Sequence, residues 1–246
     1  MWLGLAAVLA PVWLWLVRAS LDMYGEMTGA SAWMMRASWD AAFTAQMFAM
    51  WTAMMAGMML PSAAPAVLIF ARVARSGPAA DRPVLRAYLF SAGYLLVWTA
   101  FSAAATLLQR ELARAALVTP MMEAATPYFA AAVLAVAGLY QWSALKRACL
   151  ARCRTPTQWL VEHWRPGAAG ALRMGIAHGV YCLGCCWALM LLLFAGGVMS
   201  LWVIAGLSLF VLVEKLGSLG RRGDQLAGAA LVVGAVGLAL LALLRP

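Results

Sequence analysis

Long runs of apolar residues alternate along the chain with short polar segments. The runs are continuous, without a period of two, and they are rich in Ala, Leu and Met, which favours helices over strands. Several approach the roughly 20 residues that a helix needs to cross a bilayer core of about 30 Å. Because backbone polar groups must be paired internally inside lipid, the pattern predicts membrane-spanning helices.

Seven spans are predicted, to within a few residues at each boundary. The first is the weakest because it is short and contains Pro11; it is expected to be retained because no basic segment precedes it. Losing it would leave six spans without changing the sides of the other connectors. The second contains Pro61, where a kink is expected, and the sixth is short. The spans are 2–17, 43–70, 88–109, 128–145, 174–195, 201–213 and 226–244.

The composition agrees with a polytopic transmembrane helical bundle of the all-α class. Hydrophobic residues make up 65% of the 246 positions and charged residues 11%. A soluble chain of this length has no way to hide that much apolar surface. No connector is long enough to hold a core of its own, so we expect a single transmembrane domain over residues 1–246.

The net charge of +9 has a distribution that argues against nucleic acid as a partner and for the lipid bilayer. No basic stripe with exposed aromatic residues is visible; the Lys and Arg residues lie between apolar runs. Of the 18 basic residues, 13 fall in the second-to-third, fourth-to-fifth and sixth-to-seventh connectors, which share a side. The positive-inside rule places that side, and the N-terminus with it, in the cytoplasm.

Methionine is concentrated in the second predicted span. Six of the 16 Met residues fall in the run MFAMWTAMMAGMML, residues 47–60. At about 100° per residue, Met47, Met50, Met54 and Met58 form one stripe, with Met55 beside it. Met is a flexible packing residue, but a run of thioethers is also a soft ligand field that suits Cu(I). The stripe is therefore either irregular core packing or part of a copper site.

Cysteine is concentrated in the fifth predicted span, in HGVYCLGCCWALM, residues 178–190. His178, Cys182 and Cys185 lie within about 60° of one helical face, with Cys186 at its margin and Met190 beyond it. A lone buried Cys behaves as a small hydrophobe, but three in five residues beside a His indicate metal or redox chemistry. The spacing matches no zinc-finger pattern, and the donors suit Cu(I) better than Mg²⁺ or Ca²⁺.

The two clusters are expected at the same depth in the bilayer. The second span runs inward, with its midpoint near Met55 and Met58, and the fifth runs outward, with its midpoint near Cys185. The sequence leaves open whether the two helices are neighbours. Gly57, Gly179 and Gly184 would permit their close approach.

Other polar residues lie near the cytoplasmic ends of the spans. Cys149 and Cys153, in CLARC, are either a second pair that binds metal or takes part in redox chemistry, or two reduced thiols with no functional role. Glu214 and Lys215 are expected to mark the water boundary, with an inward-facing Glu214 as the alternative. Trp159 in the connector 146–173 is expected to anchor that segment at the interface.

Three hypotheses follow from these residues. The first is a membrane protein that binds Cu(I) and passes it to a protein partner, with Cys182, Cys185, Cys186, His178, Met54, Met55 and Met58 as proposed ligands and Met50 and Met190 as further candidates. The second is a transmembrane thiol–disulfide oxidoreductase that uses the same cysteines. The third is a structural or assembly subunit of a larger membrane complex. Hydrolase and P-loop motifs are absent, so catalysis is not expected under the first or third hypothesis.

Four segments carry a resemblance to a known family: MWTAMMAGMMLPSAAP (50–65), LYQWSALKRACLARCR (139–154), GVYCLGCCWALM (179–190) and VEKLGSLG (213–220). Over a core of about 47–246, the chain resembles the bacterial predicted metal-binding integral membrane proteins, a domain of unknown function sometimes labelled copper chaperone. The resemblance implies the inner, cytoplasmic membrane as the location and copper as the metal handled. Ser218 stands where the family is expected to have Pro more often.

Overall fold

The computed structural model describes residues 2–25, 27, 30–35, 38–76, 82–217 and 220–244, and Ser218 therefore lies outside the described residues. This part of the chain is helical; its extended contacts amount to one isolated bridge between Val118 and Ala124. The all-helical prediction is confirmed. The elements are α1 (Trp2–Met23), α2 (Ala30–Met34), α3 (Ala41–Ser76), α4 (Pro83–Arg114), α5 (Pro127–Gln141), α6 (Ala144–Arg154), α7 (Pro156–Glu162), α8 (Gly167–Met190), α9 (Leu192–Gly196), α10 (Leu201–Lys215) and α11 (Gly220–Leu244).

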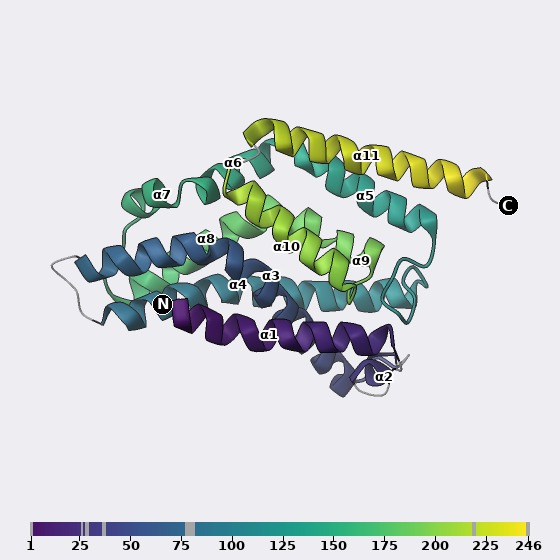
Figure 1. The fold of residues 1–246 in the computed structure, drawn as a ribbon, viewed down its shortest axis with the longest axis horizontal. Helices are drawn as coiled ribbons and strands as arrows, with labels where there is room; N and C mark the ends of the chain where they lie inside the picture. Colours follow the sequence, from purple (N-terminus) through teal and green to yellow (C-terminus); the bar gives the residue numbers. More distant parts are fainter. Residues whose placement is uncertain are drawn as a thin grey trace.

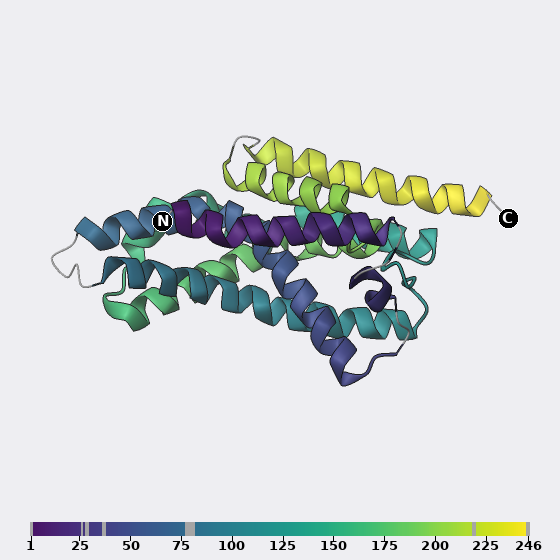
Figure 2. The same ribbon diagram turned by 60° about the horizontal axis from the view of Figure 1, so that its bottom comes forward.

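Seven of these helices lie roughly along one axis and alternate in direction. Figures 1 and 2 show α1, α4, α8 and α11 running one way and α3, α5 and α10 running the other. The α3–α4, α6–α7 and α10–α11 regions consequently lie toward one end of the bundle, which we call the basic end.

Five helical segments are long and apolar enough to cross a membrane: Ala6–Met23, Ala41–Arg75, Pro83–Arg114, Gly167–Gly196 and Arg222–Leu244. A sixth candidate is the pair α5 and α6, which passes the same test together but is bent by 65°. Six of the seven predicted spans therefore correspond to candidate spans, the fourth of them only as a bent pair of helices, whereas the predicted span 201–213 does not. Helix α10 has 15 residues, or about 22 Å at 1.5 Å per residue, which is shorter than the bilayer core.

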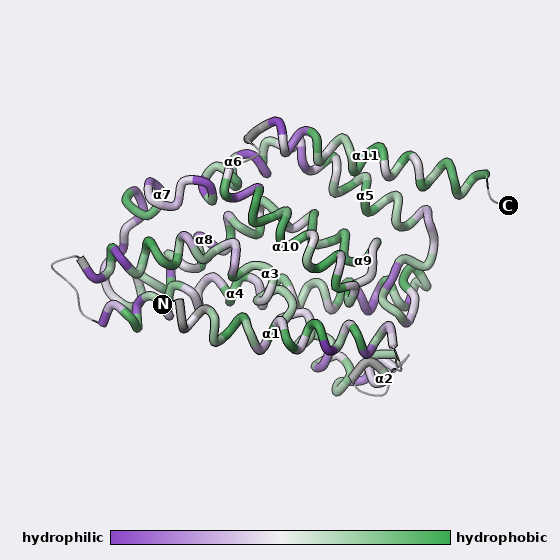
Figure 3. Tube along the Cα trace, viewed as in Figure 1, coloured by the Kyte–Doolittle hydropathy of each residue, from purple (hydrophilic) through white to green (hydrophobic). Residues whose placement is uncertain are grey.

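The surface of the helices is apolar along their lengths. Figure 3 shows hydrophobic positions through the middle of the bundle and hydrophilic positions gathered toward the ends of the helices. Helix α11 packs on α5 and exposes large side chains, among them Leu226, Val233 and Leu243. An exposed apolar surface of this extent fits lipid as its surroundings.

Helices α4 and α8 make the closest approach in the bundle core. A side chain on Gly175 would collide with the Phe90 carbonyl oxygen, and one on Gly93 would collide with the Leu172 carbonyl oxygen. The three glycines expected to join the second and fifth spans serve other contacts, because Gly57 faces α1, Gly179 faces α4 and Gly184 faces Cys149 of α6. The tight α4–α8 packing holds α4 beside the cysteine motif.

Helix α3 changes direction part-way along its length (Figure 2). Pro61 lies inside it and has no N–H to donate to the Gly57 carbonyl four residues earlier. That carbonyl accepts a hydrogen bond from the Trp13 indole at 3.2 Å instead. The expected effect of Pro61 is thus visible, and α1 compensates for the lost backbone bond.

Trp159 does not anchor the connector at an interface, as its sequence position had suggested. Its side chain is buried in a second hydrophobic core, with Phe70 and Phe90. The α7 helix that carries it folds back against α3, which brings the Trp159 ring within 5.5 Å of the His178 ring, measured between centroids.

Candidate metal centre

The predicted stripe of Met47, Met50, Met54 and Met58 lies fully inside the bundle, together with Met55. From here on, the methionine stripe means Met50, Met54, Met55 and Met58. None of the four side chains is more than 2% exposed, and all belong to the hydrophobic core that also holds the α8 cysteines. Trp51 fixes this part of α3, because its indole donates to the Gln109 amide oxygen at 2.6 Å and its ring lies 5.3 Å from that of Phe194. The stripe is therefore shielded from lipid and from water.

The thiol cluster, which we define as Cys153, Cys182, Cys185 and Cys186, lies farther toward the basic end. The three α8 cysteines are fully buried. The Cys185 and Cys186 thiols both donate to the Cys182 carbonyl oxygen, each at 3.0 Å. Both sulfurs are therefore folded back on their own helix, one turn from the Cys182 side chain.

The Cys182 sulfur differs from its neighbours because it contacts two other helices. The Tyr94 hydroxyl of α4 lies 3.0 Å from it. The Lys215 ammonium of α10 donates to it at 2.8 Å and also donates to the Ser62 hydroxyl of α3 at 2.7 Å. Cys182 is thus the point where side chains of α3, α4, α8 and α10 converge.

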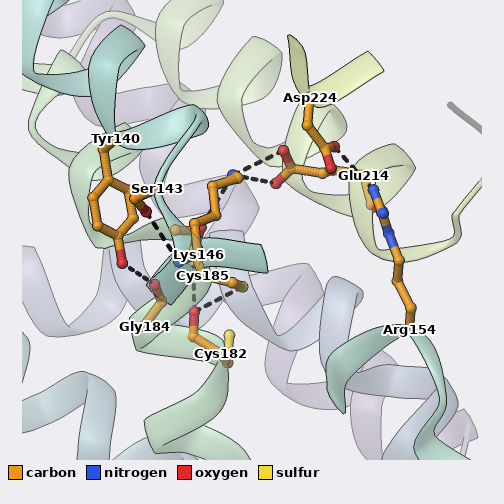
Figure 4. Close-up of polar contacts among 10 residues, drawn as sticks. Tyr140, Ser143, Lys146, Arg154, Cys182, Gly184, Cys185, Glu214 and Asp224 are labelled. Atoms are coloured by element: carbon orange, nitrogen blue, oxygen red, sulfur yellow. Dashed lines mark hydrogen bonds and ion pairs between the residues drawn. The ribbon is translucent and has the colours of Figure 1, made fainter. Parts of the chain in front are cut away.

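Glu214 and Lys215 do not mark the water boundary, since both side chains are buried. They point in different directions: Lys215 reaches Cys182, whereas Glu214 forms an ion pair with Lys146 of α6 at 2.8 Å. The alternative of an inward-facing Glu214 is confirmed. Figure 4 shows this pair above the α8 cysteines, where Lys146 also donates to the Cys185 carbonyl oxygen at 3.1 Å.

A second ion pair extends this network toward the basic end. Arg154 of α6 lies 2.9 Å from the Asp224 carboxylate of α11, and its Nε donates to the Glu214 carbonyl oxygen at 2.8 Å (Figure 4). Helices α6, α10 and α11 are therefore tied together by charged groups next to the cysteine motif. A buried ion pair is weak support for stability on its own, but removing one partner leaves a costly unpaired charge.

Cys149 and Cys153 both lie against α8. Cys153 is 8% exposed and lies in the same hydrophobic core as the three α8 cysteines. The Cys149 sulfur lies 2.6 Å from the position that a Cβ on Gly184 would occupy, so the glycine makes room for it. The bend between α5 and α6 turns this pair toward the buried cysteines.

His178 is buried one turn before Cys182. Its ring packs among Phe90, Tyr94 and Trp159, with centroid distances of 5.9, 5.9 and 5.5 Å. Its Nδ1 atom has no hydrogen-bond partner among the described residues. Such an orphaned buried nitrogen is uncommon and marks a place where a ligand or water would be favourable.

A cavity of about 120 Å³ lies beside His178, toward the basic end. We call it the Lys215 cavity. Its lining includes Ser62, Cys153, Arg154, His178, Lys215 and Leu216. The cavity therefore connects the Lys215–Cys182 contact with residues of α3, α6 and α10.

The relative depth of the two sulfur regions follows from contacts that link α3 to α8 and α9. Near the basic end, Tyr94 bridges the Met59 carbonyl oxygen, at 3.1 Å, and the Cys182 sulfur. Toward the other end, Trp51 meets Phe194 of α9. Because α3 runs antiparallel to α8, Met58 lies beside the first contact, near the cysteine motif, and Met54 lies between the two contacts, toward Met190.

The described residues contain no group of three or more His, Cys, Asp or Glu side chains arranged to hold a metal ion. The cause is visible in the hydrogen bonds, since the Cys185 and Cys186 thiols turn to a backbone carbonyl and His178 turns to aromatic rings. The donors nevertheless fit Cu(I) as cargo, because thiols and thioethers in a dry core are the soft ligands that this ion prefers. Rotation of the thiols would be needed to converge on one ion.

Comparison with protein families adds to this geometry. Residues 48–238 match the family PpoB2, described as copper chaperone. The chain belongs to this family. The copper chaperone match covers the methionine stripe, the thiol cluster and the Glu214–Lys215 pair, and it confirms the resemblance noted from the sequence. No curated protein and no solved structure matches the chain.

Several residues of the site were missed from the sequence alone. Tyr94, Lys146 and Ser62 all contact the cysteine motif or its lysine, but each was passed over as part of an apolar span or a basic connector. A signal was present for Ser62 and Tyr94, since each is a polar side chain inside a run long enough to span a membrane. For Lys146 no local pattern separates it from the neighbouring surface residue Arg147.

Proposed function

We propose that this copper chaperone family member is a multi-pass membrane protein that binds Cu(I) in its core and transfers it to a protein partner. In this proposal α1, α3, α4, α5, α8, α10 and α11 all cross the cytoplasmic membrane, and α10 does so together with the residues on either side of it. The basic end faces the cytoplasm. The observation that carries the proposal is the placement of the methionine stripe and the α8 cysteines in one buried core at overlapping depth.

The proposed ligands fall into two groups. Cys182, Cys185 and Cys186 supply thiolates for tight binding, while Met50, Met54, Met55, Met58 and Met190 supply neutral thioethers that bind more weakly and exchange more easily. Cys149 and Cys153 form a second pair nearer the basic end. His178 lies one turn from Cys182 and would join the site after rotation of its ring.

Copper analysis of the detergent-purified protein tests this proposal directly. The protein is loaded with Cu(I) under anaerobic reducing conditions, and bound copper is measured together with the sulfur coordination by X-ray absorption. We expect about one or more Cu(I) per chain with a sulfur-dominated first shell in the wild type, and loss of tight binding in the triple variant Cys182→Ser, Cys185→Ser, Cys186→Ser. Equal retention of Cu(I) by this variant would contradict the proposal.

A matched control separates ligand loss from general damage. Met174 is a buried methionine in the second core, away from both sulfur regions. The Met174→Leu variant is expected to bind Cu(I) as the wild type does. If it lost copper to the same degree as the cysteine variant, the loss would reflect disturbed folding, and the cysteines would not be assigned as ligands.

A thiol–disulfide oxidoreductase is the second candidate, because Cys153 of α6 and Cys185 of α8 are buried in one core and the two helices pack against each other. A cycle would oxidise the two thiols to a disulfide with release of two electrons and two protons to an acceptor of quinone or disulfide class. Trapping with an alkylating reagent distinguishes the candidates. Thiols that are protected when Cu(I) is present and free when it is removed support the chaperone, whereas a disulfide that forms and is reduced during turnover supports the oxidoreductase.

A further inference from the structure

The Lys215 cavity has a chemical character that the proposed copper site does not by itself require. Its lining side chains include the Lys215 ammonium, the Arg154 guanidinium, the Ser62 hydroxyl, His178 and the Cys153 thiol, and no carboxylate lines it among the described residues. Arg154 is partly neutralised by Asp224, but Lys215 donates to the neutral Ser62 hydroxyl and to a sulfur. The cavity thus offers hydrogen-bond donors and positive charge to an anionic group.

The cavity also reaches from the buried thiols to the surface. At its inner side, Lys215 contacts the Cys182 sulfur at 2.8 Å. At its outer side lies Leu216, which is 61% exposed. His178 is 3% exposed, lines the same space, and has an Nδ1 atom without a described partner. A small anionic group that enters here would meet the Lys215 ammonium and the Arg154 guanidinium, and it would stop beside Lys215, which contacts Cys182.

We propose that the Lys215 cavity is a port through which a thiolate from another molecule reaches the bound Cu(I). This inference rests on the proposed copper function and deepens it, because it names the chemistry of the exchanging ligand and the end of the bundle where exchange occurs. A cysteine of a partner protein and a small free thiol share this chemistry. Its volume of about 120 Å³ admits one side-chain-sized group and excludes a folded segment.

The exchange step requires no oxidant or reductant. The incoming thiolate forms a Cu–S bond while the bond between copper and the Cys182 sulfur breaks, and copper remains Cu(I) throughout. The vacated Cys182 sulfur keeps the negative charge that it carried as a copper ligand, and the Lys215 ammonium, which donates to this sulfur at 2.8 Å, lies next to that charge. Lys215 acts as a positioning residue in this step, since it stabilises the departing ligand.

Charged thiol reagents test the port without copper. Two methanethiosulfonates of similar size, one carrying a sulfonate and one a trimethylammonium group, are applied to the wild-type protein, and labelling is followed at each cysteine by peptide mass spectrometry. We expect Cys153 to react about tenfold faster with the anionic reagent, after correction for the rates with a free thiol. Cys149, which does not line the cavity, provides the control on the same molecule.

Two variants and one solution condition sharpen this measurement. At Cys153, the ratio of the labelling rate with the anionic reagent to the rate with the cationic reagent is expected to fall in Lys215→Met, toward the ratio measured at Cys149. Lys215→Arg is expected to preserve the wild-type ratio. If Lys215→Met does not fold, high salt applied to the wild type has the same purpose, because screening weakens a partly exposed cationic site. Equal rates with both reagents at Cys153, or a faster cationic reagent, would overturn the proposal.

Copper transfer then identifies the source of the thiolate. Ala66→Leu fills the cavity from α3, and Ala64→Leu adds the same side chain at a neighbouring α3 position that does not line it. We expect Ala66→Leu, but not Ala64→Leu, to slow Cu(I) transfer at least about tenfold. Faster transfer to glutathione than to a folded dithiol protein at equal thiol concentration indicates a free thiol, and the reverse indicates a protein partner.

Failure of the proposed port and failure of the proposed copper function give different results. Transfer that is equally fast in both alanine variants would overturn the port while leaving copper binding intact. Absence of bound Cu(I) in the wild type would overturn the proposed function, and the labelling ratio at Cys153 would still report the anion preference of the cavity.

Discussion

The methionine stripe and the thiol cluster lie in the same core, but their surroundings differ. Around the stripe the side chains are apolar, and the described hydrogen bond from Trp51 to Gln109 is between neutral groups. Around the thiol cluster, two lysines and a tyrosine are buried within hydrogen-bonding distance of the cysteine motif, and a buried glutamate is paired with one of these lysines. The first region can change its packing at little cost, whereas in the second each charge depends on a specific partner.

This difference suggests a division of tasks between the two regions. Neutral thioethers in an apolar core bind a monovalent soft ion without a large electrostatic cost, so they suit passage of the ion along α3. Thiols bind Cu(I) as thiolates, and a buried ammonium beside them balances the negative charge of a thiolate when copper leaves it. The thiol cluster therefore suits capture and controlled transfer of Cu(I). The predictions below test this contrast, beginning with the largest expected effect.

Breaking the Lys146–Glu214 pair is expected to destabilise the protein most. Both side chains are 1% exposed, so Glu214→Gln leaves the Lys146 ammonium buried without its counter-charge. We expect a loss of about 3–5 kcal/mol in the free energy of unfolding, measured by denaturant titration in detergent. Lys146→Met together with Glu214→Leu is expected to recover most of that loss. Similar stability of the Glu214→Gln variant and the wild type would show that the pair is not buried in the folded protein.

Cu(I) affinity is expected to depend more on the thiol cluster than on the stripe. Cys182→Ser replaces the sulfur at the convergence of four helices, and we expect an affinity loss of about 100-fold, or about 2.7 kcal/mol. Met58→Leu, near the cysteine motif, is expected to lose about tenfold or less. Competition with a Cu(I)-specific chelator measures both. The reverse order would make the stripe the tight site and remove the proposed division of tasks.

These sites show which parts of the structure the sequence was able to predict. Each of the seven predicted spans became a helix, because apolar runs of that length have few alternatives in lipid. The Met and Cys faces were predicted because their periodicity is local, and both are buried together. The contacts that organise the thiols were missed, since the partners of Cys182 lie 88 positions away at Tyr94 and 33 away at Lys215.

Two errors have a common physical cause. Glu214 and Trp159 were assigned to the water boundary or the interface because of their residue types and their places near the ends of apolar runs. Glu214 is buried because α6, after the bend at Gln141–Ala144, brings Lys146 over it. Trp159 is buried because α7 folds back against α3. Periodicity within one segment carries no information about such returns of the chain.

Within the methionine region, the Trp51–Gln109 hydrogen bond is expected to be the costliest contact to remove. Trp51→Phe leaves the buried Gln109 amide without its indole donor at 2.6 Å, and we expect a loss of about 1–3 kcal/mol. Trp51→Phe combined with Gln109→Leu removes both polar partners and is expected to recover part of the loss. A double-mutant cycle of unfolding free energies measures the coupling. Additive losses would indicate that the two groups do not interact.

The smallest effect on folding is expected at Met54, which is fully buried. Met54→Leu nearly conserves volume in an apolar environment, so the metal-free protein should lose less than about 1.5 kcal/mol. Stabilisation by Cu(I) should fall more visibly, because a ligand stabilises the folded state in proportion to the logarithm of its affinity. Thermal unfolding with and without Cu(I) measures both quantities in one experiment, with Met174→Leu as the control. An unchanged Cu(I) shift in Met54→Leu would mean that this thioether only packs, and the path along α3 would then be limited to the methionines nearer the thiol cluster.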